Sequence, residues 1–547
     1  MQYCGMQAEG NELSVRLGTT AIDYVNEIKT QFEQQIKEIQ DNYEHQIHKL
    51  KNSMIEYQNK YLDIKERYDL LIFKRFMRSA EQIPLDDKQQ LLFTNEAEPC
   101  EIPLQDSEEE EKTEVKSYSR SKAGRKPIDP SIRRVEKIID IPEDEKTCAC
   151  GAQLTKIGEE TSEKLHIIPQ QVYVEKTIRP KYACRSCEGV EEEGEKPTVK
   201  IAPVEPAIIP RSIASPSLLS TIFINKFEDH LPYYRQEKQF ERIGVTISRQ
   251  DMANWQQYVY RILIVLFDLM KKAVKSGPVI RMDETTVQVL REEGRSYTEK
   301  SYMWLARGGP PGQQVVWYEY HPTRAAYNAR AFLEGYSGYL QTDGYEGYDS
   351  AVKDMGGIIH VGCFAHARRY FFEASKVSEK PGSAEEGIKH IRKLYYLEDE
   401  LRSQNLADEK FLDERKARAG PILEKFKSWL LKKADEVPPT RLLGKAVHYS
   451  LSQWEKMTAY LESPYLTPDN NICENAIRPF VLGRKNWLFC QSPEGAKSSC
   501  GIYTLIETAK QNKLVPFYYL KELFEKAPYA STTEDWEKLL PWNILNN

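Results

Sequence analysis

The segment 19–83 contains neither glycine nor proline. Apolar residues recur along it from Val25 to Leu71 with a mean spacing of about 3.5 residues. This spacing is typical of a coiled coil, in which an apolar stripe on one helix packs against a partner helix. The bulky Tyr43, Tyr57 and Tyr61 leave the number of helices open. We expect a coiled coil over 19–83 that joins copies of the chain, although a long helix folded back on its own protein would show the same pattern.

Pro84 ends this helical pattern, and we interpret 84–140 as a linker that carries a basic arm. An acidic run at 106–114 is followed by the sequence Gly-Arg-Lys-Pro at 124–127. Arms of this kind enter narrow minor grooves of DNA. Arg125 and Lys126 are therefore candidate DNA contacts, and a charged linker without a partner is the alternative.

Four of the ten cysteines form two close pairs, Cys148-x-Cys150 and Cys184-x-x-Cys187. Four thiolates brought together in this way can bind one zinc ion tetrahedrally. We predict a zinc-binding module over 141–190 with these four ligands. Free buried thiols or a redox pair are the alternatives. Ten scattered cysteines in a chain of 547 residues do not suit a secreted disulfide framework.

Helical spacing returns over 211–262. Gly244 permits a tight turn, and Ser248 with Asp251 forms a capping box for the next helix. A helix, a turn and a capped helix make up the DNA-binding helix-turn-helix, whose second helix presents its first residues to the bases. Arg249 and Gln250 are the candidate base contacts. Many helical hairpins share this form without binding DNA.

Three acidic residues stand in distinctive surroundings. Asp283 and Asp343 lie in or at the end of short apolar β-type runs, and Glu474 opens a segment with helical spacing. Carboxylates on rigid elements suit Mg²⁺, which prefers oxygen ligands. Two such ions, about 3.5–4 Å apart, activate the attacking oxygen and stabilise the leaving oxygen at a phosphodiester. The three acids are the candidate catalytic and magnesium-binding residues, although any one alone is more often a turn or strand-end residue.

Alternating apolar residues predict strands at 279–290, 302–306, 315–320, 339–342 and 358–362. We assign 277–375 and 461–490 to one α/β catalytic core. The segment 376–460 has helical spacing and is predicted to be a helical insertion, and 491–547 a C-terminal helical tail. Cys363 and His366 have no evident partners for a metal site, so we interpret them as packing and hydrogen-bonding residues.

Basic and aromatic side chains follow Glu474 closely, and Gly483 is expected to end their helix. Cations at this place suit phosphate contacts, and an indole offers a stacking surface for a base. A surface ion pair and a core tryptophan are the alternative interpretation. The candidate DNA contacts here are Arg478, Arg484, Lys485 and Trp487.

The string at 469–487 reads Asp-Asn-Asn-Ile-Cys-Glu-Asn-Ala-Ile-Arg-Pro-Phe and ends in Gly-Arg-Lys-Asn-Trp. It resembles the insertion-sequence-66 family of transposases, and the resemblance covers nearly the whole chain. It implies a multidomain α+β protein with a ribonuclease H-like core. It further implies an Asp-Asp-Glu triad at Asp283, Asp343 and Glu474, which uses Mg²⁺ or Mn²⁺. Cys473 departs from the small residue expected before the glutamate, and this change leaves the carboxylate in place.

The resemblance also implies a structural zinc ion and a role in DNA recombination. The partners of the protein would be the ends of a mobile element and target DNA, and helper proteins of the element are possible further partners. The net charge of −6 weighs against a general DNA-coating protein, so local basic patches must bind the DNA.

The first ten residues lack the features of a signal peptide, and the apolar run at 262–267 is too short to span a bilayer. We therefore expect a cytoplasmic, nucleoid-associated bacterial protein. Two other classes stay open. A ribonuclease H-like nuclease, such as a junction resolvase, would use the same carboxylates, and a non-enzymatic DNA-binding protein derived from a transposase would keep the binding modules.

Overall fold

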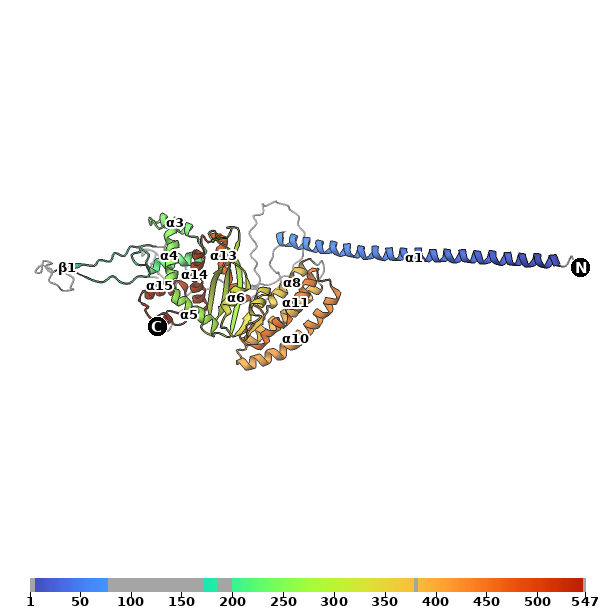
Figure 1. Cartoon of the computed structure of the whole chain (residues 1–547). Helices are drawn as coiled ribbons and strands as arrows, with labels where there is room; N and C mark the ends of the chain where they lie inside the picture. Colours follow the sequence, from blue (N-terminus) through green and yellow to red (C-terminus); the bar gives the residue numbers. More distant parts are fainter. Residues whose placement is uncertain (1–4, 77–170, 184–198, 378–381, 545–547) are drawn as a thin grey trace, which may run out of the picture. The chain divides into compact units, whose positions relative to one another are not determined.

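The computed structural model describes residues 5–76, 171–183, 199–377 and 382–544 of the chain (Figure 1). The chain divides into one unit made of 1–97 with 205–547 and a second unit made of 98–204. In the second unit, β1 (Lys181–Ala183) pairs with β2 (Val199–Ile201) in antiparallel fashion. The predicted linker at 84–140 and the zinc-binding module at 141–190, except for 171–183, lie outside the described residues.

The helix α1 (Gly5–Phe76) is 72 residues long. It includes residues 19–76, which are the described part of the segment predicted to be helical. Its apolar stripe faces solvent: Val25 is 62% exposed, Ile47 50% and Leu71 66%. The predicted long helix is confirmed, and its pairing with a partner helix stays a prediction.

Five strands form one mixed sheet in the order β5-β4-β3-β6-β7. β4 is antiparallel to β3 and β5, whereas β3, β6 and β7 run parallel to one another. Each strand overlaps one of the five strands predicted from the sequence, which confirms that prediction. The strands are β3 (Val279–Gln288), β4 (Lys300–Gly308), β5 (Val315–His321), β6 (Gly338–Gln341) and β7 (Ile358–Val361).

A helical hairpin precedes the sheet and has the predicted turn and cap. Gly244 adopts a φ of +81°, which favours glycine, between α3 and α4. The Ser248 hydroxyl accepts a hydrogen bond from the Asp251 backbone N–H at 3.1 Å, and the Asp251 carboxylate accepts one from the Ser248 N–H at 3.3 Å. The helices before the sheet are α2 (Pro216–Phe227), α3 (Tyr233–Arg242), α4 (Arg249–Ile262) and α5 (Ile264–Lys275).

One hydrophobic core joins this helical region, the sheet and the C-terminal helices. On α14, the hydroxyls of Thr504 and Thr508 accept hydrogen bonds from backbone N–H groups of β5 at 3.0 and 3.1 Å. Gln256 of α4 donates to Ser498 of α14 at 2.7 Å. The helical hairpin therefore packs as part of the core. The C-terminal helices are α13 (Asn471–Trp487), α14 (Pro493–Gln511), α15 (Pro516–Lys526) and α16 (Thr533–Lys538).

A second hydrophobic core lies among the helices that follow β7. In Figure 1, α8, α10 and α11 lie together in yellow and orange. The predicted helical character of 376–460 is confirmed for its described residues. Among all the described residues of the chain, no helix is long and apolar enough to cross a membrane. The helices are α8 (Phe364–Val377), α9 (Ser383–Ser403), α10 (Asp408–Glu436), α11 (Leu442–Ser452) and α12 (Trp454–Thr458).

A buried arginine ties this second core to the segment that leads back toward the sheet. The Arg415 side chain is fully buried, and its guanidinium pairs with Glu398 at 2.7 Å. It also donates to the carbonyl oxygens of Tyr460 and Ser463, both at 2.9 Å, and of Leu466 at 3.1 Å. Since buried polar groups that lose their partners are costly, this arginine is a strong determinant of the local structure.

We predict that Arg415→Met, which keeps an apolar stem but removes the donors, lowers the free energy of unfolding by about 3 kcal/mol. The matched control is Arg418→Ala. Arg418 is 40% exposed and pairs with the exposed Glu400, so its loss should cost less than about 1 kcal/mol. Urea unfolding followed by circular dichroism measures both, and equal small losses would contradict the assigned role of Arg415.

Candidate active site

Asp283 lies in the middle of β3, the central strand of the sheet. Successive side chains of a strand point to opposite faces, so Asp283 and Glu284 occupy different faces. The pKa of Asp283 is held well above its usual range, first by burial and then by the negative charges of Glu284, Glu474 and Asp343. The structure therefore brings the three predicted acids within electrostatic range of one another.

Asp343 lies two residues after the end of β6, the strand directly beside β3. The two strands are parallel, and Gln341 of β6 is in register with Arg281 of β3. Each of these residues stands two positions before one of the aspartates, so the same face of the sheet carries both acids. The Asp343 carboxylate also accepts a hydrogen bond from the Tyr345 backbone N–H at 3.0 Å, which fixes its direction.

A buried arginine holds the loop before α13 against these two strands. Arg281 donates to the Gln341 side chain at 3.0 Å and to the Tyr465 carbonyl at 2.7 Å. Gln341 in turn donates to the Thr467 carbonyl at 2.6 Å. Burial lowers the pKa of Arg281 to about 10, so its guanidinium keeps its charge at neutral pH. This chain of hydrogen bonds leads directly to the helix that carries Glu474.

The start of α13 is fixed by Asn470. Its side chain donates to the Met282 carbonyl of β3 at 3.1 Å, and its backbone N–H donates to the Cys363 sulfur at 3.2 Å. Asn470 makes no side-chain cap hydrogen bond to the helix, because its amide is engaged with β3. Glu474 consequently lies in the first turn of a helix that is anchored to the sheet.

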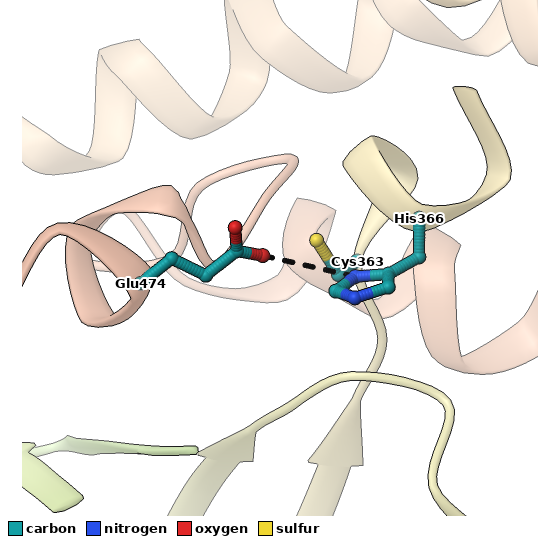
Figure 2. Close-up of side chains that lie close together, drawn as sticks. All are labelled: Cys363, His366 and Glu474. Carbon is teal, nitrogen blue, oxygen red and sulfur yellow. Dashed lines mark ion pairs between the residues drawn. The ribbon is translucent and has the colours of Figure 1, made fainter. Parts of the chain in front are cut away.

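Figure 2 shows that the carboxylate of Glu474 and the imidazole of His366 point toward one another, with the Cys363 thiol close by. His366 Nδ1 and Glu474 Oε1 are 3.9 Å apart, and both atoms are buried without a hydrogen-bond partner. Burial lowers the pKa of His366, and the charges of Glu474 and Asp343 oppose this shift. The sequence showed no partner for a metal site at Cys363 and His366, and Glu474 is such a neighbour, distant in the chain and adjacent in space. The predicted packing and hydrogen-bonding role agrees with the buried Cys363, whose sulfur accepts a hydrogen bond.

The three acids Asp283, Asp343 and Glu474 form a group that fits a divalent cation. Carboxylates that raise one another's proton affinity are stabilised when a cation lies between them. The unsatisfied Oε1 of Glu474 is a further sign, since buried polar atoms normally have a partner. Asp283, Asp343 and Glu474 would supply the oxygen ligands that Mg²⁺ or Mn²⁺ prefers.

On the opposite face, Glu284 forms a polar cluster that was not anticipated. Its side chain is 1% exposed, pairs with Arg324 and accepts a hydrogen bond from the Tyr348 hydroxyl. The guanidinium of Arg324 lies 3.7 Å from the centre of the Tyr345 ring. Arg324 lies just before α6 (Ala326–Leu333), Tyr345 just before α7 (Glu346–Val352), and Tyr348 on α7. Glu284 is thus held by Arg324 and Tyr348, although its charge still contributes to the raised pKa of Asp283.

The structure alters the interpretation of the residues after Glu474. Arg484 donates to the hydroxyl and the carbonyl of Thr286 in β3, so this guanidinium joins α13 to the sheet. Trp487 packs against Phe480 with 5.4 Å between ring centres. Lys485 is exposed, and Arg478 is partly exposed.

Gly483 does not end the helix as expected, since α13 continues to Trp487. A Cβ at this glycine would lie 2.5 Å from the Tyr503 hydroxyl oxygen, so close packing against α14 accounts for it. The helix ends instead at Leu488, which has a φ of +66°.

The other predicted binding residues lie apart from the carboxylates in the chain. Arg249 and Gln250 are exposed at the start of α4, and their contact with DNA stays a prediction. Arg125, Lys126 and the predicted zinc ligands Cys148, Cys150, Cys184 and Cys187 lie outside the described residues.

Three family models match the chain. Residues 211–498 match the transposase IS66 family, 145–188 match the zinc-finger binding domain of transposase IS66, and 504–542 match the IS66 C-terminal element. The zinc-finger match spans all four predicted cysteine ligands and supports a structural zinc ion.

Similar proteins occur in Sinorhizobium fredii. The uncharacterized protein y4jD is 32% identical over 423 residues, which are 75% of this chain and 80% of that protein. The uncharacterized protein y4qI is 32% identical over 436 residues, which are 78% of each chain.

We predict that Asp283→Asn raises the melting temperature of the metal-free protein at neutral pH. The pKa of Asp283 is higher in the folded than in the unfolded chain, so the folded state binds more protons and loses stability as the pH rises through that interval. Asparagine is neutral throughout, so its advantage should vanish below about pH 4, where the aspartate is protonated in both states.

Thermal unfolding in EDTA between pH 4 and 8 measures this difference. The control is Asp349→Asn, which should have the opposite effect. The pKa of Asp349 is lowered to about 2, chiefly by its hydrogen bond to His360. A wild type as stable as Asp283→Asn at neutral pH would show that the acids are not in mutual repulsion.

Proposed function

The chain belongs to the IS66 family of transposases, and we propose that it cuts DNA at the ends of an insertion sequence and joins it to target DNA. The observation that carries this proposal is the convergence of Asp283, Asp343 and Glu474 from two parallel strands and the helix anchored to them. The order of the five strands supports a ribonuclease H-like core, in which the acids lie at neighbouring strands and a facing helix.

The three carboxylates would hold two divalent cations, which when bound activate the attacking oxygen and stabilise the leaving oxygen. The residues of the chain position the acids for this role. Arg281 and Gln341 fix the two strands and the loop relative to one another, and Asn470 sets the start of the glutamate-bearing helix. In strand cleavage the attacking oxygen comes from water, and in joining it comes from the 3′-hydroxyl freed by the first step.

We propose that DNA is recognised by separate parts of the chain. Arg249 and Gln250, exposed at the start of α4, would contact bases of the element's ends. The exposed Lys485 and the partly exposed Arg478 would contact phosphates beside Glu474. Arg484 would act by holding α13 to β3 and so would position the site.

The basic arm at Arg125 and Lys126 and a zinc ion bound by the four cysteines would add contacts outside the described residues. We also propose that α1 pairs with α1 of a second copy. The apolar stripe from Val25 to Leu71 is exposed along the described helix, and a partner helix with the same stripe would cover it.

The two alternative classes are less well supported. A ribonuclease H-like nuclease would use the same acids, but the chain also matches the zinc-finger and C-terminal models of the transposase family. A non-enzymatic DNA-binding descendant could lose the acids, and this chain keeps all three in one cluster.

We predict that Asp283→Asn, Asp343→Asn and Glu474→Gln each lower strand cleavage and joining by about a hundredfold or more. Each substitution removes a negative charge that stabilises a cation, while the DNA-contacting surfaces are unchanged. Binding to the element's ends should therefore stay within about threefold of wild type. The assays are cleavage and strand transfer with labelled end duplexes, together with a binding titration.

Glu494→Gln is a suitable control because Glu494 lies in the first turn of α14 and outside the acidic cluster. It should retain wild-type activity. A variant of one of the three acids that cleaves and joins normally would remove that residue from the site.

We further predict that Arg249→Ala and Gln250→Ala reduce the preference for end sequences over random DNA. Each lost base contact should cost about 1–3 kcal/mol of discrimination. Lys485→Ala, as the comparison, should weaken binding to both DNAs equally, because phosphate contacts carry little sequence information. Equal loss of specific and random binding in the Arg249 and Gln250 variants would reduce the start of α4 to a scaffold.

A further inference from the structure

The distance between His366 and Glu474 is too long for a hydrogen bond and suits two ligands of one metal ion. At 3.9 Å, His366 Nδ1 and Glu474 Oε1 are too far apart for a hydrogen bond. The separation is shorter than two metal–ligand bonds of about 2.1 Å each. Both atoms are buried and unsatisfied, so the fold places two potential ligands side by side and leaves them without a partner.

The neighbouring Cys363 does not complete a zinc-thiolate site. Its thiol is buried. Its sulfur already accepts a hydrogen bond from the Asn470 backbone N–H. This contact gives the cysteine a role in anchoring the loop before α13.

The imidazole, in contrast, is available as a ligand. Its Nδ1 is buried and has no hydrogen-bond partner, and an imidazole in its neutral form has a nitrogen lone pair to donate. His366 lies on α8 in the helical region of the second core, while Glu474 lies on α13 in the first core. The two elements meet at this point and present one nitrogen and one oxygen donor to the same space (Figure 2).

We propose that His366 is a nitrogen ligand of the cation held by Glu474, so that this position takes Mn²⁺ or a later transition-metal ion in preference to Mg²⁺. This inference rests on the proposed acidic cation site and adds a fourth residue to it. Imidazole binds first-row transition metals well, whereas Mg²⁺ retains oxygen ligands and waters. The histidine thus biases the choice of metal at one position of the site.

The test uses the full-length, zinc-loaded protein with Mn²⁺ as the probe. Pulsed electron paramagnetic resonance of bound Mn²⁺ detects coupling to a directly bound ¹⁴N nucleus without any catalytic turnover. We expect this coupling in the wild type and its loss in His366→Asn. The affinity for Mn²⁺ should fall about tenfold or more in that variant, and the affinity for Mg²⁺ should fall by much less.

Two matched variants separate the alternatives. Cys363→Ser should keep the nitrogen coupling, because the sulfur is not a ligand. Glu474→Gln should weaken Mn²⁺ binding itself. The wild-type spectrum shows whether any nitrogen is bound, so absence of the coupling overturns the role of His366 even where His366→Asn does not fold.

Mn²⁺ that binds in a manner dependent on Glu474 but shows no ¹⁴N coupling would overturn the role of His366 and leave the proposed acidic site intact. A wild-type protein that binds no Mn²⁺ at millimolar concentration would overturn both. Nitrogen coupling that persists in a folded His366→Asn protein would show that the ligand is another residue.

Discussion

The buried guanidinium of Arg281 connects the three chain segments that carry the acidic residues. It lies two positions before Asp283 on β3, bonds the side chain two positions before Asp343 on β6, and reaches the carbonyl of Tyr465 in the loop that leads to α13. A charged group retained in the interior must have its donors satisfied, and this one finds its partners on separate segments. The relative placement of the acids depends on that one side chain more than on any local preference of the strands.

The same arrangement explains why the site lies between two cores. The sheet, α4 and α14 share one hydrophobic core, and α8 to α11 share the other. Arg415 secures the segment at 460–466 within the second core, and the chain then crosses to the start of α13. The acidic residues are brought into mutual repulsion, which costs stability in the absence of a cation and creates affinity for one. A site of this kind needs rigid support on both sides.

Local sequence patterns predicted a large part of this structure. The five strands and the capping box at Ser248 follow from alternation and turn chemistry, because those features are set by neighbours in the chain. The three acids were singled out by their surroundings and by the family resemblance, and their catalytic role stays a prediction. The contact between His366 and Glu474 could not be predicted, since the helices of the second core separate them in sequence. The same holds for Arg484, whose bond to Thr286 depends on how α13 packs against β3. Gly483 resembled a helix end and is instead a point of close packing.

The central claim is that Asp283, Asp343 and Glu474 hold divalent cations for phosphodiester chemistry. Anomalous diffraction from crystals of the protein soaked in Mn²⁺ tests this claim most directly, because it locates the ion without reference to activity. The account predicts anomalous density bonded to oxygen atoms of all three residues, at about 2.0–2.3 Å from each. Saturating Mn²⁺ with no density at this cluster, or density that leaves Asp283 without contact, would contradict it.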